Sequence, residues 1–209
     1  MAGLKDAKIV NFFASPFMIY TWPDSDALND GLREKILAQE QITGGEAKSR
    51  SNVGGWHSDS GLLEFCGEAG KTLIARMIEM ADGATRQTLA GRNVPPFNWK
   101  LEIWANVNRT GDFNRKHTHG FSTWSGTYYV DDGDPPPDAE HGTALELTDP
   151  CQSRADTFFA TVLPPGIYIR PVPGLMIIFP SHVPHMVYPH NGKRPRISIA
   201  FNLIKDPFP

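Results

Sequence analysis

The sequence predicts a mainly β protein of the α+β class, in which N-terminal helices pack outside a cupin-like jelly roll, the double-stranded β-helix. Apolar residues recur at helical spacing in the first ninety residues, whereas from Phe97 onward they alternate with a period of two. Turns rich in proline and glycine, such as 131–137 and 171–174, separate the short β-branched and aromatic runs that follow residue 90. Such spacing is typical of antiparallel strands.

The composition favours a single domain that buries a substantial core. The 209 residues show no break in composition, so we expect a mostly helical part over 1–92 packed on a β core over 93–209. The net charge of −3 argues against nucleic acid or an anionic membrane as a partner. No apolar run approaches the roughly 20 residues that span a bilayer, and the N-terminus does not resemble a secretory signal. With only two cysteines, the expected location is the cytoplasm.

Two helices are expected before the β region. Ser25 or Asp26 can cap a helix that runs to about Gln41, because leucines and isoleucines follow at helical spacing. A second helix is expected over 62–82, where a broad apolar stripe is typical of ordinary core packing.

Eight short strands with proline-rich turns suit a jelly roll. The loop 131–142 is expected to be long and exposed. The expected strands are 98–108, 122–130, 142–148, 157–163, 166–170, 174–179, 184–189 and 195–204.

Three histidines in the β region have a spacing typical of metal ligands. His117 and His119 are two residues apart, so on a strand their side chains project from the same face. His185 follows much later in the chain, in a second histidine-rich stretch. Two imidazoles close in sequence and one distant imidazole can form a three-ligand facial site, which leaves coordination positions open for substrate and oxygen.

A hairpin prediction separates His185 from its competitor His182. Asn191-Gly192 is the strongest two-residue signal for a type I′ turn, and that turn would place His185 opposite Ser198. Opposed side chains share a face, so His185 would lie with Ser198 and Arg196, and His182 would not. Several prolines nearby leave a bulge and a shifted register open.

Arg196 and Ser198 suggest a carboxylate receptor near this metal site. An arginine on an inward barrel face is costly unless it meets an anion. Its planar guanidinium can hold a carboxylate through two parallel hydrogen bonds, and the serine hydroxyl can add a third. A structural Asp or Glu as the partner of Arg196 remains the alternative.

The sequence resembles the 2-oxoglutarate/iron(II)-dependent oxygenases, in particular a family of bacterial and phage proteins among them. The resemblance covers most of the chain and rests on these motifs: Asn11-Phe12-Phe13-Ala14-Ser15-Pro16, Ser51-Asn52-Val53-Gly54-Gly55-Trp56, Gly111-Asp112-Phe113, His117-Thr118-His119, Trp124-Ser125-Gly126-Thr127-Tyr128-Tyr129-Val130, Phe179-Pro180-Ser181 and Arg196-Ile197-Ser198-Ile199.

The resemblance implies a role for each candidate residue. His117 and His185 would be the first and distal iron ligands, and Arg196 with Ser198 would bind the C5 carboxylate of 2-oxoglutarate. It further implies Asn106 near the C1 end of the co-substrate, and a hydroxyl from Tyr128 or from Tyr129; we take Tyr128 as the candidate. His119 stands where most of the superfamily has Asp or Glu, and a third neutral imidazole makes the iron site one positive charge richer.

The function predicted is that of an iron(II)- and 2-oxoglutarate-dependent dioxygenase that hydroxylates a small molecule or a protein side chain. A three-histidine metal cupin, acting as a dioxygenase or isomerase without 2-oxoglutarate, is the first alternative. Gly111 before the two histidines fits a cupin motif, although the glutamate expected after them is absent. A non-catalytic ligand-binding jelly roll is the second alternative. A homodimer is the expected assembly.

Overall fold

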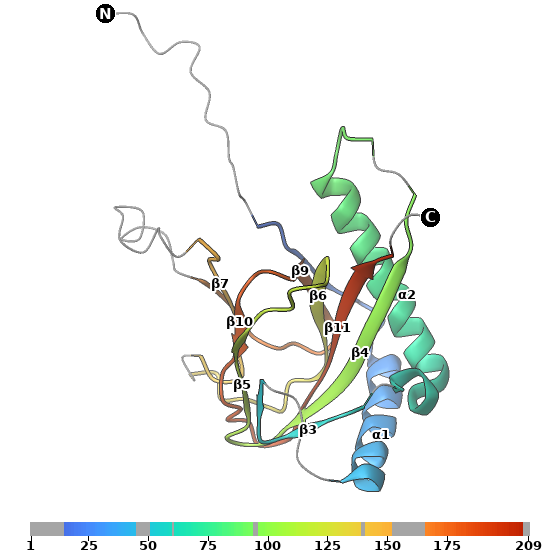
Figure 1. The fold of residues 1–209 in the computed structure, drawn as a ribbon. Coiled ribbons are helices and arrows are strands. Elements are labelled where there is room, and N and C mark those ends of the chain that lie inside the picture. Colours follow the sequence, from blue (N-terminus) through green and yellow to red (C-terminus); the bar gives the residue numbers. More distant parts are fainter. Residues whose placement is uncertain are drawn as a thin grey trace, which may run out of the picture.

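The computed structural model describes residues 15–44, 51–59, 61–93, 96–138, 141–151 and 166–206, which form two antiparallel sheets and two helices (Figure 1). The six-stranded sheet has the order β1 (Met18–Thr21), β9 (Leu175–Pro180), β6 (Trp124–Asp131), β11 (Arg196–Lys205), β4 (Trp99–Asn108) and β3 (Trp56–His57). The five-stranded sheet has the order β2 (Asn52–Val53), β5 (Phe113–His117), β10 (His185–Val187), β7 (Leu145–Thr148) and β8 (Gly166–Ile169).

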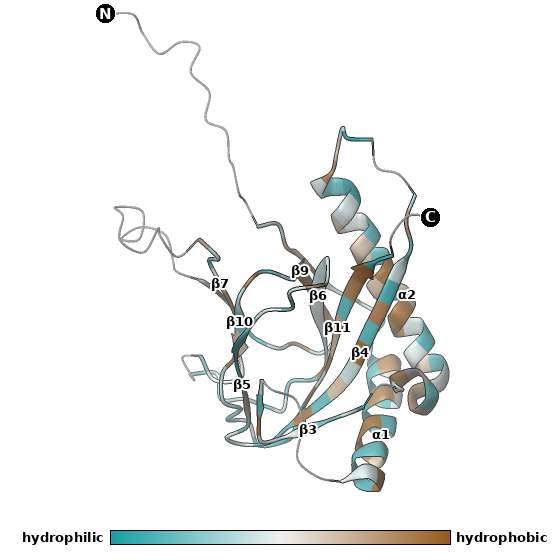
Figure 2. Ribbon diagram, viewed as in Figure 1, coloured by the Kyte–Doolittle hydropathy of each residue, from teal (hydrophilic) through white to brown (hydrophobic). Residues whose placement is uncertain are grey.

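The two helices cover the outer face of the six-stranded sheet (Figure 1). Helix α1 (Asp26–Thr43) begins after Ser25, as predicted, and α2 (Leu62–Thr88) extends beyond the predicted end and is kinked at Gly67. Their apolar faces turn towards the sheet (Figure 2) and form one core with it. The buried members from the helices include Leu32, Ile36, Leu73 and Met77.

Side chains alternate across the larger sheet, so that one face meets the helices and the other meets the five-stranded sheet. On β11, Ile197, Ile199, Phe201 and Leu203 belong to the helix-side core. Their neighbours Arg196, Ser198 and Ala200 line a cavity between the sheets, which the Phe201 ring also reaches. The alternation predicted for this strand is therefore confirmed.

Seven of the predicted strands are present, with shifted ends, and the predicted strand 157–163 lies outside the described residues. Four strands were not predicted: β1, β2, β3 and β5. The first three have only two to four residues each, too few for a clear period. Strand β5, with the sequence FNRKH, is mainly polar because part of it lines the cavity and the rest is exposed.

The predicted hairpin between β10 and β11 is wrong, because these strands belong to different sheets. His185 pairs with His117 and Leu147, whereas Ser198 pairs with Asn106 and Tyr129. The connecting segment gives its backbone hydrogen bonds to other loops and not to a tight turn. These bonds include His190 N–H to the Asp112 carbonyl, Gly111 N–H to the His190 carbonyl and Arg194 N–H to the Gly133 carbonyl.

The predicted exposed loop 131–142 is buried at its start, where Asp131 ends β6, and exposed at Asp134, Pro137 and Asp138. Asp131 is buried, and its carboxylate accepts hydrogen bonds from Arg33 of α1, from Arg194 and from the backbone N–H of Gly133. This part of the loop therefore joins the helices to the segment that precedes β11.

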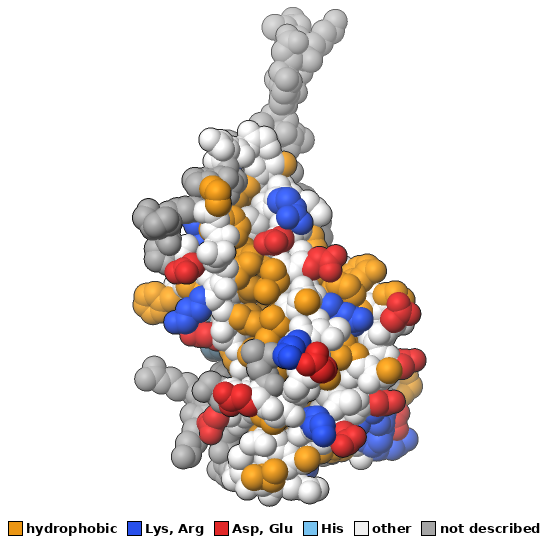
Figure 3. All heavy atoms as spheres, turned by 90° about the vertical axis from the view of Figure 1, so that its right-hand side faces the viewer, with side chains coloured by type: hydrophobic (Ala, Val, Ile, Leu, Met, Phe, Trp, Pro, Cys, Tyr) orange, Lys and Arg blue, Asp and Glu red, His pale blue; other side chains and the backbone are white. Residues whose placement is uncertain are grey.

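The helical side of the molecule carries basic and acidic side chains interspersed with apolar ones (Figure 3). Among the described residues, neither helix has a stretch that is long and apolar enough to cross a bilayer.

Candidate metal and co-substrate site

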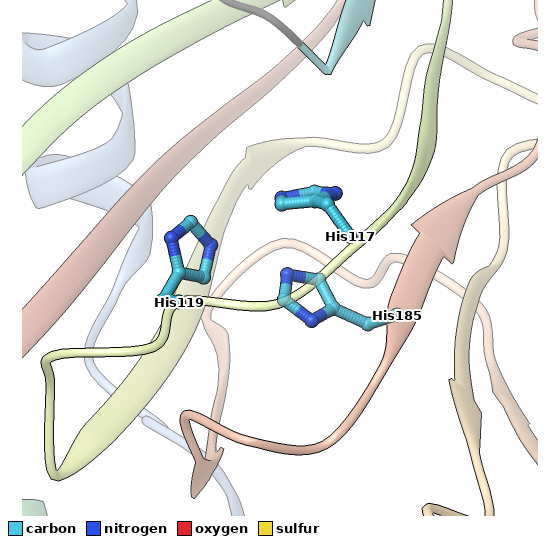
Figure 4. Close-up of side chains that lie close together, drawn as sticks. All are labelled: His117, His119 and His185. Carbon is cyan, nitrogen blue, oxygen red and sulfur yellow. The ribbon is translucent and has the colours of Figure 1, made fainter.

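The three predicted histidines come together at the cavity between the sheets. His117 ends β5, His119 follows two residues later outside the strand, and His185 begins β10 (Figure 4). Their ring centroids lie 4.3 to 5.1 Å apart, and one nitrogen from each ring lies within 4.8 Å of the others. His182 is exposed and is not part of this group. The geometry is thus that of a three-imidazole metal centre.

A local irregularity in β5 turns His117 towards the cavity. His117 pairs with His185, but Asn114 pairs with Val187, so β5 has one residue more than β10 over this stretch. An extra residue of this kind forms a β-bulge, which bends a strand and redirects its side chains. As a result both Asn114 and His117 line the cavity although they are three residues apart.

Backbone carbonyls orient two of the three rings. Nδ1 of His117 lies 2.7 Å from the Arg115 carbonyl, and Nδ1 of His185 lies 3.0 Å from the Val183 carbonyl. A carbonyl only accepts, so each Nδ1 carries the proton and each Nε2 keeps a lone pair. This arrangement is common in metal-binding histidines.

His119 has a different support. Its Nδ1 lies 3.4 Å from the side-chain nitrogen of Asn202, which is buried and also accepts a hydrogen bond from Ser125 Oγ. His119 is not on a strand, but its backbone N–H donates to the Ser181 carbonyl and ties it to the end of β9. The two histidines therefore do not share a strand, since β5 ends at His117, but their side chains do meet.

All three rings are held in the neutral form. Burial lowers the pKa of His117, and burial together with the charge of His117 lowers the pKa of His119 to about 4. Burial and the neighbouring imidazoles lower the pKa of His185 to about 3. Because a ligating imidazole must be neutral, these rings do not need to lose protons near neutral pH before they bind a metal.

Arg196 is buried in the same cavity without an acidic partner. Its Nη2 donates to Asn108 Oδ1 at 2.7 Å, its Nη1 donates to the Thr143 carbonyl at 3.3 Å, and its Nε has no partner. Within the described part of the chain, no carboxylate lies within 4 Å of the guanidinium. Arg196 therefore forms no direct ion pair with a structural Asp or Glu in the described residues, although the charge of Asp112 acts on it from a longer distance.

Asn106 and Ser198 lie beside Arg196, as predicted, and Tyr129 joins them. Ser198 is the direct cross-strand partner of Asn106 on one side and of Tyr129 on the other, and all three line the cavity. Burial raises the pKa of Tyr129 to about 12, so its hydroxyl is protonated and available as a donor.

Tyr128 does not line the cavity, so the prediction that its hydroxyl binds the co-substrate is wrong. Its hydroxyl donates to Asn29 Oδ1 of α1 at 2.6 Å, on the helical side of the sheet. Successive side chains on a strand point to opposite faces, so Tyr129 takes the inward position.

Several further residues near the site were not among the predicted site residues. Asn108 and Thr143 hold the Arg196 guanidinium, and Trp104 stands between two rings, 6.0 Å from His119 and 5.6 Å from His57. The parity of β4 could have identified Asn108, because it shares the face of Asn106. Thr143 lies in a loop, where no period exists.

Comparison with known proteins assigns the fold and the family. Residues 102–202 match the model of a family described as "Putative 2OG-Fe(II) oxygenase", and this stretch contains every predicted site residue. No protein with a curated description matches the chain in sequence.

Three solved structures share the fold at 14–18% identity. A prolyl-4-hydroxylase of Pseudomonas putida is 18% identical with a TM-score of 0.62, over 91% of this chain and 93% of its own. A prolyl hydroxylase of Trichoplax adhaerens, in complex with a hypoxia inducible factor peptide fragment, is 14% identical with a TM-score of 0.60, over 90% and 83%. AviO1 of Streptomyces viridochromogenes is 15% identical with a TM-score of 0.59, over 93% of both chains.

These similarities show that the two sheets form a double-stranded β-helix, as predicted. The three imidazoles and the buried arginine that line the cavity all lie within the matched region. Over residues 102–202, just under half of its length, the chain matches the 2OG-Fe(II) oxygenase family, whose members are oxidoreductases that use iron(II) and 2-oxoglutarate.

Proposed function

We propose that His117, His119 and His185 hold the iron(II) of this oxygenase and that Arg196 binds the distal carboxylate of 2-oxoglutarate beside it. One observation supports this assignment above all others: a buried arginine without an acidic partner shares a cavity with three neutral, convergent imidazoles. A buried charge without a partner is costly, so the guanidinium is suited to an anion that arrives with the co-substrate.

The residues present fit both groups. Imidazole nitrogens are good ligands for iron(II), and two of the rings are already oriented with Nε2 free. The distal carboxylate has the unpartnered Nε of Arg196 and the hydroxyls of Ser198 and Tyr129 as donors. Asn106, whose side-chain oxygen is buried without a partner, is assigned to the keto-acid end.

The proposed reaction is hydroxylation of a C–H bond. Bound iron(II) supplies the activation of dioxygen, with 2-oxoglutarate as the source of two electrons. Overall, 2-oxoglutarate, dioxygen and the substrate R–H give succinate, carbon dioxide and R–OH, so that one oxygen atom enters each organic product. The protein's own residues position the keto acid and keep the imidazoles neutral, and the residues that line the cavity position the substrate.

His119 makes the proposed site one positive charge richer than a site with two histidines and a carboxylate. If Nε2 of His119 binds the metal, Nδ1 carries the proton, and the Asn202 amide then has to present its oxygen to that ring. We assign Asn202 to this supporting role.

The substrate class proposed is a small molecule or a peptide side chain. The structural neighbours named above include two prolyl hydroxylases, one of them with a bound peptide, which is compatible with either class. A cytoplasmic location, a homodimer and the lack of a nucleic-acid partner stay predictions from the sequence. So does the division into a helical part over 1–92 and a β core over 93–209 within one domain.

Anaerobic titration of the iron(II) protein with 2-oxoglutarate tests the proposal. Chelation of the metal by the keto acid is expected to produce a charge-transfer band in the visible range. Arg196→Ala is expected to shift the titration to a much higher 2-oxoglutarate concentration, because the distal carboxylate loses its charged partner. A wild-type protein that binds iron but shows no band on addition of 2-oxoglutarate would refute the co-substrate assignment.

A further inference from the structure

Behind Arg196 lies a buried polar pair that does not line the cavity, Thr143 and His190. Thr143 is fully buried and His190 is 1% exposed. They come from two loops that are far apart in sequence, one before β7 and one between β10 and β11. Neither has a place in the function proposed above.

Hydrogen bonds link His190 to Thr143 and Thr143 to Arg196. The Arg194 carbonyl can only accept, so Nε2 of His190 donates to it at 2.7 Å. Nδ1 of the neutral ring then accepts from the Thr143 hydroxyl at 2.8 Å. The carbonyl of the same Thr143 accepts from Nη1 of Arg196 at 3.3 Å.

Thr143 holds this position in an unfavourable backbone conformation. Its φ of 72° lies in the left-handed region, where a β-branched residue is rarely found. Such a conformation persists only where the surroundings impose it, and it is most common at functional sites. Here the backbone N–H donates to the Pro189 carbonyl at 3.1 Å. The hydroxyl lies 2.8 Å from His190 Nδ1, its shortest contact, and also contacts Asn191, 3.3 Å from Oδ1 and 3.5 Å from the backbone nitrogen.

The fold leaves a space that the His190 ring fills. A Cβ on Gly133 would lie 2.5 Å from Cε1 of His190, and a Cβ on Gly192 would lie 2.6 Å from the same atom. Both glycines therefore allow the loops to close on the imidazole. The ring is a fixed part of the wall behind Arg196 and not a mobile surface group.

We propose that Thr143 and His190 are positioning residues for Arg196, which set the orientation of its guanidinium for a dicarboxylic keto acid. This inference rests on the proposed role of Arg196 and deepens it. Asn108 accepts from Nη2 of the guanidinium and the Thr143 carbonyl accepts from Nη1, which leaves Nε without a protein partner and available to a ligand. Without the bond to His190, the strained Thr143 relaxes, its carbonyl shifts, and the guanidinium loses one of its two anchors.

The experiment compares two keto acids on the iron(II)-loaded protein without oxygen. The first, 2-oxoglutarate, has a distal carboxylate, and the second, 2-oxopentanoate, has the same chain without it. Thr143→Val keeps the shape of the side chain and removes the hydroxyl, and Thr143→Ser keeps the hydroxyl. Thr110→Val is the matched control, because the Thr110 hydroxyl donates to Gly192 on the same segment but does not reach Arg196.

We expect Thr143→Val to raise the Kd of 2-oxoglutarate about tenfold, the effect of one lost buried hydrogen bond. The Kd of 2-oxopentanoate is expected to stay within about twofold. Thr143→Ser and Thr110→Val are expected to behave like the wild type. Should Thr143→Val fail to fold, His190→Gln gives the same test, since its amide can still donate to the Arg194 carbonyl but offers Thr143 no acceptor at Nδ1.

Three results would overturn the inference. They are an unchanged Kd of 2-oxoglutarate in Thr143→Val, an equal loss for both keto acids, and an equal loss in Thr110→Val. A wild-type protein that binds both keto acids equally would refute the role of Arg196, and the inference with it. That last outcome is seen before any variant is made, so the failure of the proposed function is distinguishable from the failure of the positioning pair.

Discussion

At the scale of single residues, the three imidazoles of the proposed iron site are held in different ways. His117 and His185 are fixed by backbone carbonyls, that of Arg115 within β5 and that of Val183 just before β10. His119 relies on a side-chain amide at 3.4 Å and lies beyond the end of β5. It is therefore the ligand with the weakest support, and its contribution to metal binding can be measured directly.

His119→Ala is expected to weaken iron(II) binding more than about a hundredfold, because loss of a supporting residue alone already costs about 10- to 100-fold. His182→Ala is the control, since His182 is exposed and lies outside the cluster. Anaerobic iron(II) titration measures both. Equal affinities of the wild type and His119→Ala would reduce the site to two histidines.

His190 gives the metal-free protein a specific dependence on pH. Burial lowers the pKa of His190 below its ordinary value of about 6.5. As the pH falls below about 6.5, the unfolded chain takes up a proton that the folded ring does not, so the free energy of unfolding decreases. His190→Gln removes this term, and its stability is expected to fall less steeply, by up to about 1.4 kcal/mol per pH unit. Urea unfolding of the metal-free proteins between pH 7 and pH 5 measures the difference, and parallel curves would contradict it.

At the scale of secondary-structure elements, the direction of side chains could be predicted but the partners of a strand could not. The alternation on β11 is local, so the sequence sufficed to place Arg196 and Ser198 on one face. The partner of β10 depends on contacts with β5 and β7, which lie far away in the chain. Asn191-Gly192 favours a turn locally, but loop-to-loop hydrogen bonds override that preference.

Dependence on distant strand partners also explains why Tyr128 was predicted to face the cavity, whereas Tyr129 does. Because side chains alternate between the two faces of a strand, only one of two consecutive residues can face inward. Which of the two does so depends on the register of β6 against β11. That register pairs Tyr129 with Ser198. It contains a shift between Ile197 and Ser198, which no pattern in the sequence indicates.

Two glycine-to-alanine substitutions test the packing of these elements, because they are expected to change the stability in opposite directions. A Cβ on Gly126 of β6 would overlap the Phe201 ring and lie 2.6 Å from the Ile177 carbonyl, so Gly126→Ala is expected to cost about 1–3 kcal/mol. A Cβ on Gly31 of α1 would meet Ala69 at 4.0 Å, an ordinary contact. Gly31→Ala is expected to stabilise the protein by about 0.5–1 kcal/mol, because alanine favours the helix. Chemical denaturation measures both, and two changes of the same sign would contradict the packing described.

At the scale of the whole molecule, the helices and the co-substrate site are joined through the sheet and through one buried carboxylate. The apolar core connects α1 and α2 to the helix-side face of β6, β9 and β11. The opposite face of these strands lines the cavity between the sheets. Asp131 adds a polar link, because it binds Arg33 of α1 at 2.9 Å and Arg194 at 2.9 Å. Arg194 in turn provides the carbonyl that accepts from His190. Neither Arg33 nor Asp131 attracts notice in the sequence, since ion pairs across 98 residues leave no local pattern.

Asp131→Asn is therefore expected to destabilise the fold more than a surface ion pair would. The buried carboxylate accepts three hydrogen bonds, two of them from arginines, and its loss is expected to cost about 1.5–3 kcal/mol. Asp30→Asn is the matched control, because Asp30 binds the same Arg33 at 2.7 Å from a side chain that is 75% exposed. Exposed pairs contribute little, so this change is expected to cost less than about 1 kcal/mol. Urea denaturation of both variants measures the difference, and equal losses would mean that Arg33 is held by its own helix and that Asp131 does not join the helices to the site.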